Sequence, residues 1–370
     1  MSLTSSHRHL RHTGFCALVA VCLVSSSSFA QEAADRLTEA LEAESEPEAA
    51  PQPEAAPQPE AAPERASGPA QPRERDWLAK GSPGYYAVAY GADWAFVALS
   101  AGLSATGAWN QLKPPFTLLG PSVDDDAPKL AELFDPRLDP VIGRPLVHEK
   151  VPTWALAAAA GSAIVGAGVV DGFARQDFHH THSLVLGAAA ATMLTLDVTE
   201  VLKLTFGRLR PDFRERYTRA ACQGLVQRPD GLDCAPVSDG FLLDRGDYVD
   251  GYKSFPSGHS STSFALATYL SLWIGSEWIW GARSTELSQP LATLAVGGLY
   301  AGALFTAASR VSDNRHHLED VAVGAALGSA LGAATWLLYF DLDGEARWRD
   351  LSLTPVVLED GAALSLSGRF

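Results

Sequence analysis

Six apolar segments recur along the chain, each about as long as a helix that crosses a lipid bilayer. They cover residues 84–108, 153–173, 183–205, 259–281, 290–308 and 318–340. A helix rises about 1.5 Å per residue, so about 20 residues reach across the hydrocarbon layer of a membrane. The pattern predicts an all-α protein, a six-helix bundle that is embedded in a membrane.

The composition of these segments leaves a second interpretation open. They are rich in alanine and glycine, which let membrane helices approach closely but suit a tightly packed soluble bundle equally well. Asp93, Asp197 and Glu200 interrupt the apolar runs, and charged groups are rare inside a bilayer.

The residues before the first apolar segment predict export followed by a spacer. Residues 1–30 have a basic start, a short apolar run and small residues up to Ala30, as in a cleaved signal peptide; an uncleaved membrane anchor is the alternative. Residues 31–83 are dominated by Pro, Ala and Glu, a composition that buries too little apolar surface to fold. We therefore expect a disordered linker.

The chain changes character again after the sixth segment. Residues 343–370 alternate leucine with polar residues around Asp360 and Gly361, a pair that favours a tight hairpin turn. We expect a small C-terminal β-hairpin extension, which leaves residues 84–342 for the six-helix domain.

The formal net charge of −15 says little about a partner, because about half of the excess lies in one short tract of the linker. Ten Asp or Glu and only two Arg lie between Gln31 and Arg65. No basic stripe exceeds what one phosphate site needs, so nucleic acid is not an expected partner.

Two cysteines remain once the signal peptide is removed. Cys222 and Cys234 lie twelve positions apart in one polar stretch, and in an exported protein this spacing predicts a disulfide. Two unrelated thiols are the alternative. No further Cys or His lies beside them at ligand spacing, so we expect no metal there.

The first of three polar clusters closes the third apolar segment. Lys203 and Arg210 are seven residues apart, or two helical turns, so both can point to one side of a helix. Such a pair suits an anion, although a basic cluster that flanks a membrane would also explain the arginines nearby.

The second cluster, Ser257-Gly258-His259, stands at the predicted start of the fourth helix. Free N–H groups and the helix dipole favour an anion there, and Gly258 lets the backbone come close to it. Ser257 adds a hydroxyl donor, and His259 can exchange a proton near neutral pH. A serine N-cap beside an incidental histidine would explain the same residues.

The third cluster joins the fifth and sixth segments. His316 and Asp320 are four residues apart and share a helix face, so the carboxylate could hold one ring nitrogen and leave the other free to attack. Arg310 adds a planar fork for phosphate oxygens. A helix-capping carboxylate beside a surface histidine pair is the alternative.

The order of the helices brings the three clusters together. In an up-and-down bundle, the end of the third helix, the start of the fourth and the junction of the fifth and sixth lie at one end. The connectivity therefore predicts a phosphate cradle with a nucleophile and an acid.

This constellation resembles the type 2 phosphatidic acid phosphatase superfamily, whose signature reads K-x6-R-P, P-S-G-H and S-R-x5-H-x3-D. Every signature residue is present, in order, between Lys203 and Asp320. The resemblance implies that His316 forms a phosphohistidine, that Asp320 orients its ring and that His259 protonates the leaving oxygen. It also implies that the phosphoryl oxygens are held by Lys203, Arg210, Ser257, Gly258 and Arg310.

The implied activity is that of a metal-independent phosphatase without a cofactor. Phosphoryl transfer needs mainly positioning and charge neutralisation, so three fixed cations can replace the usual Mg²⁺. The expected substrates are phosphate monoesters or diphosphates of lipids, such as phosphatidic acid or a polyprenyl diphosphate, with a small soluble phosphomonoester as a variant. The rival functions are a vanadate-dependent haloperoxidase and a non-catalytic envelope protein that binds anionic lipid.

Two further expectations concern location. His179, His180 and His182 precede Lys203 by about 30 Å of helix, so we expect a solvated or interfacial cluster at the opposite end rather than a metal site.

If the signal is cleaved and all six helices cross, the active site faces the cytoplasm, whereas a disulfide at the same end requires an oxidising space. We expect a membrane-associated protein of the cell envelope whose active site faces the exported side, with the Asp93 segment as the first candidate not to cross.

Overall fold

The computed structural model describes residues 79–115, 118–119, 130–234, 242–358 and 361–369. These residues all belong to one structural unit, Arg73–Phe370. The expected signal peptide, residues 1–30, and most of the expected linker, residues 31–83, lie outside the described residues.

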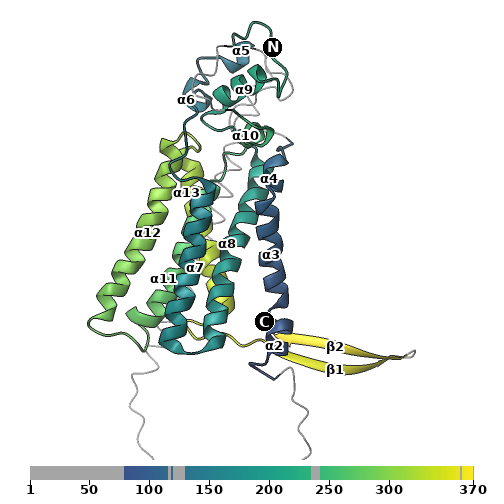
Figure 1. Ribbon diagram of the computed structural model, residues 1–370, viewed down its shortest axis with the longest axis vertical. Coiled ribbons are helices and arrows are strands. Elements are labelled where there is room, and N and C mark those ends of the chain that lie inside the picture. Colours follow the sequence, from purple (N-terminus) through teal and green to yellow (C-terminus); the bar gives the residue numbers. More distant parts are fainter. Residues whose placement is uncertain (1–78, 116–117, 120–129, 235–241, 359–360, 370) are drawn as a thin grey trace, which may run out of the picture. The chain divides into compact units, whose positions relative to one another are not determined.

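The described residues are mostly helical, and the long helices run beside one another (Figure 1). They are α3 (Gly91–Ala105), α7 (Thr153–Arg175), α8 (Phe178–Phe206), α11 (Gly258–Ile274), α12 (Ser288–Ser312) and α13 (Leu318–Tyr339). The short helix α2 (Pro83–Ala89) precedes α3, and a π-helical turn, Gly275–Ile279, extends α11.

Five short helices gather at one end of the bundle, which we call the cap (Figure 1). They are α4 (Ala108–Gln111), α5 (Leu130–Leu133), α6 (Asp139–Ile142), α9 (Phe213–Cys222) and α10 (Arg245–Asp250). At the other end, strands β1 (Asp350–Leu358) and β2 (Gly361–Arg369) pair antiparallel, with Leu353 opposite Leu366.

Helix α11 lies at the centre of the bundle, in contact with α7, α8, α12 and α13. Its approach to α13 is closest, because glycines of α13 face its backbone at intervals of four residues. A Cβ atom added at Gly328 would lie 2.0 Å from the carbonyl oxygen of Ser261, and one at Gly332 would lie 2.3 Å from that of Ala265. Only glycine permits this distance between the two helices.

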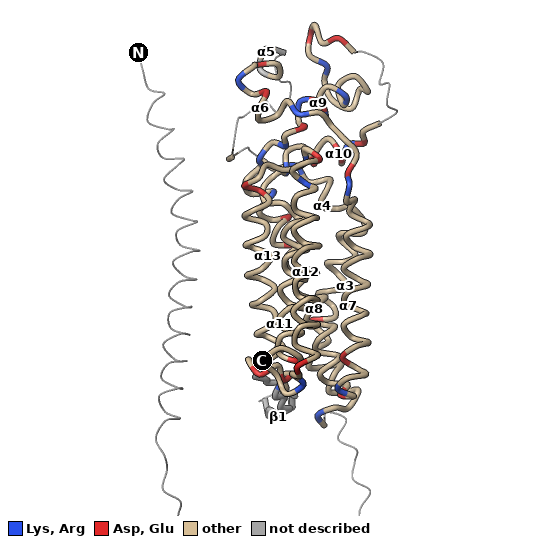
Figure 2. The backbone as a smooth tube through the Cα atoms, turned by 90° about the vertical axis from the view of Figure 1, so that its left-hand side faces the viewer, with Lys and Arg blue, Asp and Glu red and all other residues tan. Residues whose placement is uncertain are grey.

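Among the described residues, four helices are long and apolar enough to cross a membrane: α7, α8, α12 and α13. Their outward faces carry exposed apolar side chains, such as Trp154 at 74% and Phe173 at 81% exposure on α7. Charged residues gather mainly toward the two ends of the bundle (Figure 2). This distribution suits a lipid environment, since charges inside a bilayer are costly.

The first predicted helix differs from the expectation. Residues 84–108 divide into α2, α3 and the start of α4, with breaks at Tyr90 and at Gly107, whose φ of 65° is a left-handed conformation that glycine adopts readily. The charge of Asp93 is compensated rather than exposed to lipid, because its carboxylate accepts hydrogen bonds from Tyr339 and Arg349.

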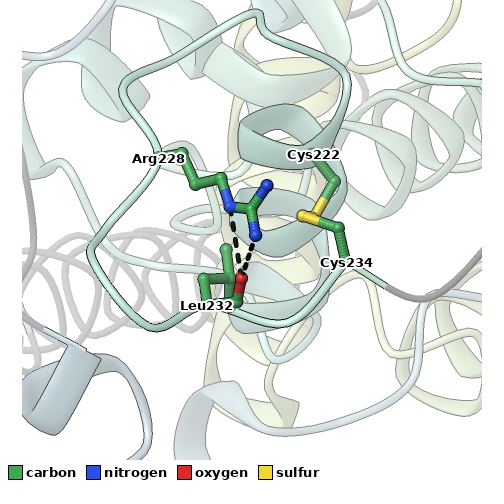
Figure 3. Close-up of a disulfide and its surroundings, with 4 residues drawn as sticks. All are labelled: Cys222, Arg228, Leu232 and Cys234. Carbon is green, nitrogen blue, oxygen red and sulfur yellow. Dashed lines mark hydrogen bonds between the residues drawn. A yellow bond between two sulfur atoms is a disulfide. The ribbon is translucent and has the colours of Figure 1, made fainter.

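The cap contains a disulfide between Cys222 and Cys234 (Figure 3). Cys222 is the last residue of α9, and Cys234 ends the loop that follows it. Within this loop the Arg228 guanidinium donates to the carbonyl oxygen of Leu232 at 2.5 Å. The covalent link and this hydrogen bond close the loop at the same end as the helix termini described below.

The close packing of α11 and α13 predicts that adding a methyl group to a glycine lowers stability on α13, where the glycine faces α11, but not on α12, where it faces open space. Gly328→Ala should destabilise the fold by about 1–3 kcal/mol, because two backbones would have to separate. Gly298→Ala on α12 is the control: a Cβ there meets nothing within 4 Å, so helix propensity should make it neutral or stabilising by up to about 1 kcal/mol. Thermal unfolding in detergent measures both, and equal unfolding temperatures would contradict the packing.

Candidate active site

One cavity of about 650 Å³ joins the three polar clusters. Its lining includes Lys203, Arg210, Gly258, His259, Arg310 and His316. These residues come from the end of α8, the start of α11, the end of α12 and the junction before α13. Ser257 and Asp320, which the sequence also singles out, are fully buried behind this lining.

Each cation of the cavity wall is paired with a carboxylate that also lines the cavity. The Nζ atom of Lys203 lies 2.6 Å from Oε1 of Glu200. Arg210 and Asp250 are 2.7 Å apart between Nη2 and Oδ1. Arg310 contacts Oε1 of Glu149 at 3.1 Å and donates to the carbonyl oxygen of Val151.

These ion pairs orient the cations before any anion arrives. Burial would raise the pKa of Asp250, but Arg210 and Arg216 attract its carboxylate, and its pKa falls to about 2. The carboxylate therefore stays ionised across the physiological range and keeps its hold on Arg210. The Nε atom of Arg210 also donates to the main-chain oxygen of Asp250. The motif spacings give no sign of these carboxylates, because Glu149 lies in a loop and Asp250 at the end of α10, both outside the motifs.

His316 is buried and turns its Nε2 atom toward the cavity. Nε2 lies 3.4 Å from Nη1 of Arg210, while Nδ1 lies 2.6 Å from the main-chain oxygen of Ser254. A carbonyl oxygen can only accept, so Nδ1 carries the proton and Nε2 keeps its lone pair. Burial lowers the pKa of His316 well below its usual value, and the charges of Arg210 and Arg310 lower it further.

Asp320 does not hold the ring of His316 directly, contrary to the geometry expected from the sequence. Its Oδ2 atom is 3.8 Å from Nδ1, beyond hydrogen-bond distance. The carboxylate accepts instead from the hydroxyl of Ser254 at 2.5 Å, from Nη1 of Arg208 at 2.5 Å and from the main-chain N–H of His317. The reason is local, since Asp320 stands in the first turn of α13 and its carboxylate turns back to the N–H of His317, the N-cap residue of that helix.

The Ser257-Gly258-His259 cluster combines a helix cap with part of the cavity wall. The hydroxyl of Ser257 faces the N–H of Ser260 at the start of α11, which is the capping role that the sequence left open. A Cβ atom at Gly258 would come within 3.2 Å of Nζ of Lys203, so glycine allows this close approach. Within the described residues, the buried Nε2 atom of His259 has no hydrogen-bond partner.

His179, His180 and His182 lie at the opposite end, as expected, but His179 and His180 are buried rather than solvated and His182 is half-buried. His179 stacks on Trp348 with ring centroids 3.6 Å apart. His180 contacts Asp171 through Nδ1 and the carbonyl oxygen of Gly344 through Nε2. Asp171, His180 and Glu277 are close enough to ligate one metal ion. Glu277 is nevertheless paired with Arg175 and Arg283, so the group forms a satisfied ion-pair network.

Comparison with known proteins supports the resemblance. Residues 184–343 match the model of the PAP2 superfamily. Lipid phosphate phosphatase 2 of Arabidopsis thaliana is 32% identical over 53% of this chain and 64% of its own length. The probable diacylglycerol pyrophosphate phosphatase 1 of Schizosaccharomyces pombe is 33% identical over 42% of this chain and 53% of its own. The chain thus spans less than two thirds of these relatives, and no solved structure matches it.

The surroundings of His316 predict how its imidazole titrates. Because its pKa is lowered, the ring should stay neutral as the pH falls through 6.5, where an exposed histidine takes up a proton. NMR of protein labelled with ¹⁵N-histidine would follow this titration, with His316→Gln to assign the signal. A midpoint at or above pH 6.5 would show that neither burial nor the neighbouring cations control the ring.

Proposed function

We propose that residues 184–343, which match the model of the PAP2 superfamily, form a domain of that superfamily, and that the protein is a metal-independent phosphatase of lipid phosphate monoesters or diphosphates. One observation carries the proposal: Lys203, Arg210, Arg310, His259 and His316 line a single cavity although they come from distant parts of the chain. Three cations beside an imidazole with a free lone pair can hold a phosphoryl group in line with a nucleophile.

In the proposed first step, Nε2 of His316 attacks phosphorus and the bond from phosphorus to the leaving oxygen breaks. Burial and the charge of Arg310 lower the pKa of His259 to about 3, so a bound anionic phosphoryl group must restore its proton before it can act as the acid. His259 then donates this proton to the leaving oxygen, and the product leaves as an alcohol, or as a phosphate where the substrate is a diphosphate. Lys203, Arg210 and Arg310 stabilise the charge on the three oxygens of the phosphoryl group, which remains on His316 as a phosphohistidine.

In the second step, water attacks the phosphohistidine. His259, now neutral, takes a proton from this water, and the bond between Nε2 and phosphorus breaks to release inorganic phosphate. His316 returns to the neutral form with its proton on Nδ1, and His259 is again protonated. The carboxylates of Glu149, Glu200 and Asp250 keep the cations oriented between turnovers, so little reorganisation is needed when the next substrate binds.

The shape of the cavity supports a lipid substrate. Beyond the cations, the cavity continues between α3, α7 and α8, where its lining is largely apolar and includes Val97, Ala101, Leu156, Ala160, Ile164, Ala189, Met193 and Leu196. From Thr153 to Ile164 this wall extends about 16 Å along α7. A phosphate head held by the cations would place an acyl or prenyl tail against these side chains.

We also propose that the long helices form a six-helix membrane bundle in the cell envelope and that the cap faces the exported side. The disulfide between Cys222 and Cys234 supports this orientation, because such bonds persist in oxidising compartments. Helix α3 has 15 residues, about 22 Å in length, which is shorter than the hydrocarbon layer and weakens the case for counting it as a full crossing.

The first test of the proposed function is a screen of the purified protein in the presence of EDTA. Phosphatidic acid, a polyprenyl diphosphate and a soluble aryl phosphate are compared for release of inorganic phosphate. The wild type should act on at least one lipid and should trap an acid-labile phosphoprotein, and His316→Ala should lose both properties while retaining its fold. Substantial turnover by His316→Ala would remove His316 from the nucleophile role.

A second prediction separates lipid from soluble substrates. Gly161 lines the apolar part of the cavity and Gly166 does not, although both are on α7 and a Cβ at either meets nothing within 4 Å. Gly161→Trp should fill the space for the tail and lower kcat/KM for lipid phosphate by about tenfold or more, which corresponds to about 1.4 kcal/mol. Its activity on the soluble aryl phosphate should stay near that of the wild type, as should both activities of Gly166→Trp. An equal loss on both substrates would argue against a tail site here.

A further inference from the structure

Ser254 connects the proposed nucleophile to the carboxylate that the sequence motif assigns to it. The main-chain oxygen of Ser254 accepts from Nδ1 of His316 at 2.6 Å, and its hydroxyl donates to Oδ2 of Asp320 at 2.5 Å. Asp320 itself is 3.8 Å from the ring. Any influence of Asp320 on the orientation of His316 therefore passes through Ser254.

Arg208 holds Ser254 from the other side. Its main-chain oxygen accepts from the N–H of Ser254 at 2.8 Å, and its guanidinium binds Asp320 at 2.5 Å. Arg208, Ser254 and Asp320 thus form a closed ring of three contacts. Two of its members are fixed to helix ends, since Arg208 follows α8 and Asp320 lies in the first turn of α13.

Because Ser254, Asp320 and His316 are buried, their contacts with one another determine the orientation of the His316 imidazole. Ser254 and Asp320 are fully buried, and His316 is 3% exposed. Water cannot easily replace a lost partner at such a position, so a deleted hydroxyl leaves the carboxylate short of one donor. The main chain at Ser254 would then lose one of its two anchors.

We propose that Ser254 is a positioning residue for phosphoryl transfer, through which Arg208 and Asp320 hold His316 with its proton on Nδ1 and Nε2 facing the cavity. A carbonyl acceptor suits this role, because it selects the tautomer without adding a negative charge next to the ring. The inference rests on the proposed function, in which Nε2 of His316 attacks phosphorus.

Ser254→Ala tests the inference, with Ser260→Ala as the matched control. The hydroxyl of Ser260 is equally buried and also bonds to α13, at the carbonyl oxygen of Val321, but it has no contact with the ring of His316. Ser254→Ala should lower kcat by about 10- to 100-fold, as small misplacements of a reacting group do. Its KM and its affinity for inorganic phosphate should stay within about twofold of the wild type, because the cations are untouched. Ser260→Ala should change none of these quantities.

Arg208→Gln provides a second route should Ser254→Ala fail to fold, because the Arg208 side chain is 20% exposed and more tolerant of change. It should show the same loss of kcat at constant KM. The positioning role would be overturned if either variant, Ser254→Ala or Arg208→Gln, kept the kcat of the wild type. It would also be overturned if KM rose by the same factor as kcat fell. Substantial turnover by His316→Ala would overturn the proposed function and this inference together. If activity depends on His316 but is unchanged in Ser254→Ala, only this inference is overturned.

Discussion

The backbone contact between α11 and α13 sets the distances within the site. Gly324 lies against Ser257, where an added Cβ would come within 2.7 Å of the main-chain oxygen, and the N–H of Ser257 donates to the main-chain oxygen of Asp320. The start of α11 and the start of α13 are thereby locked together. Since His259 stands at one helix start and His316 just before the other, the spacing of the two histidines follows from the glycines of α13.

Electrostatic balance is the second constraint on the site. Lys203, Arg210 and Arg310 would repel one another in a buried cavity, and each is stabilised by a carboxylate from the wall. The pairing reduces the cost of removing these charges from water and fixes where the donors point. A phosphoryl group that enters the cavity therefore meets cations that are already oriented, which is the condition for electrostatic catalysis at low reorganisation cost.

The apolar surface and the polar cavity serve one proposed purpose. Exposed side chains of α7 and α12 suit contact with lipid, and the cavity extends from the cations into the space between α3, α7 and α8. A lipid phosphate has the same division between a charged head and an apolar tail. The buried network of Asp171, His180 and Glu277 at the far end takes no part in this site, and its ion pairs instead tie the helix ends to the segment that follows α13.

The sequence by itself determined the mostly helical character, the approximate positions of the long helices after the first and the three clusters at the cavity, because helix periodicity and short motifs are local properties. Only the tertiary structure decided which carboxylates face the cations, since Glu149 lies in a loop and Asp250 ends α10, and no motif specifies where either one packs. It also decided that Ser254, rather than Asp320, contacts the ring of His316. Four-residue spacing places two side chains on one helix face, but His316 precedes α13 and Asp320 turns back to cap it, so the contact depends on how α8, α11 and α13 pack.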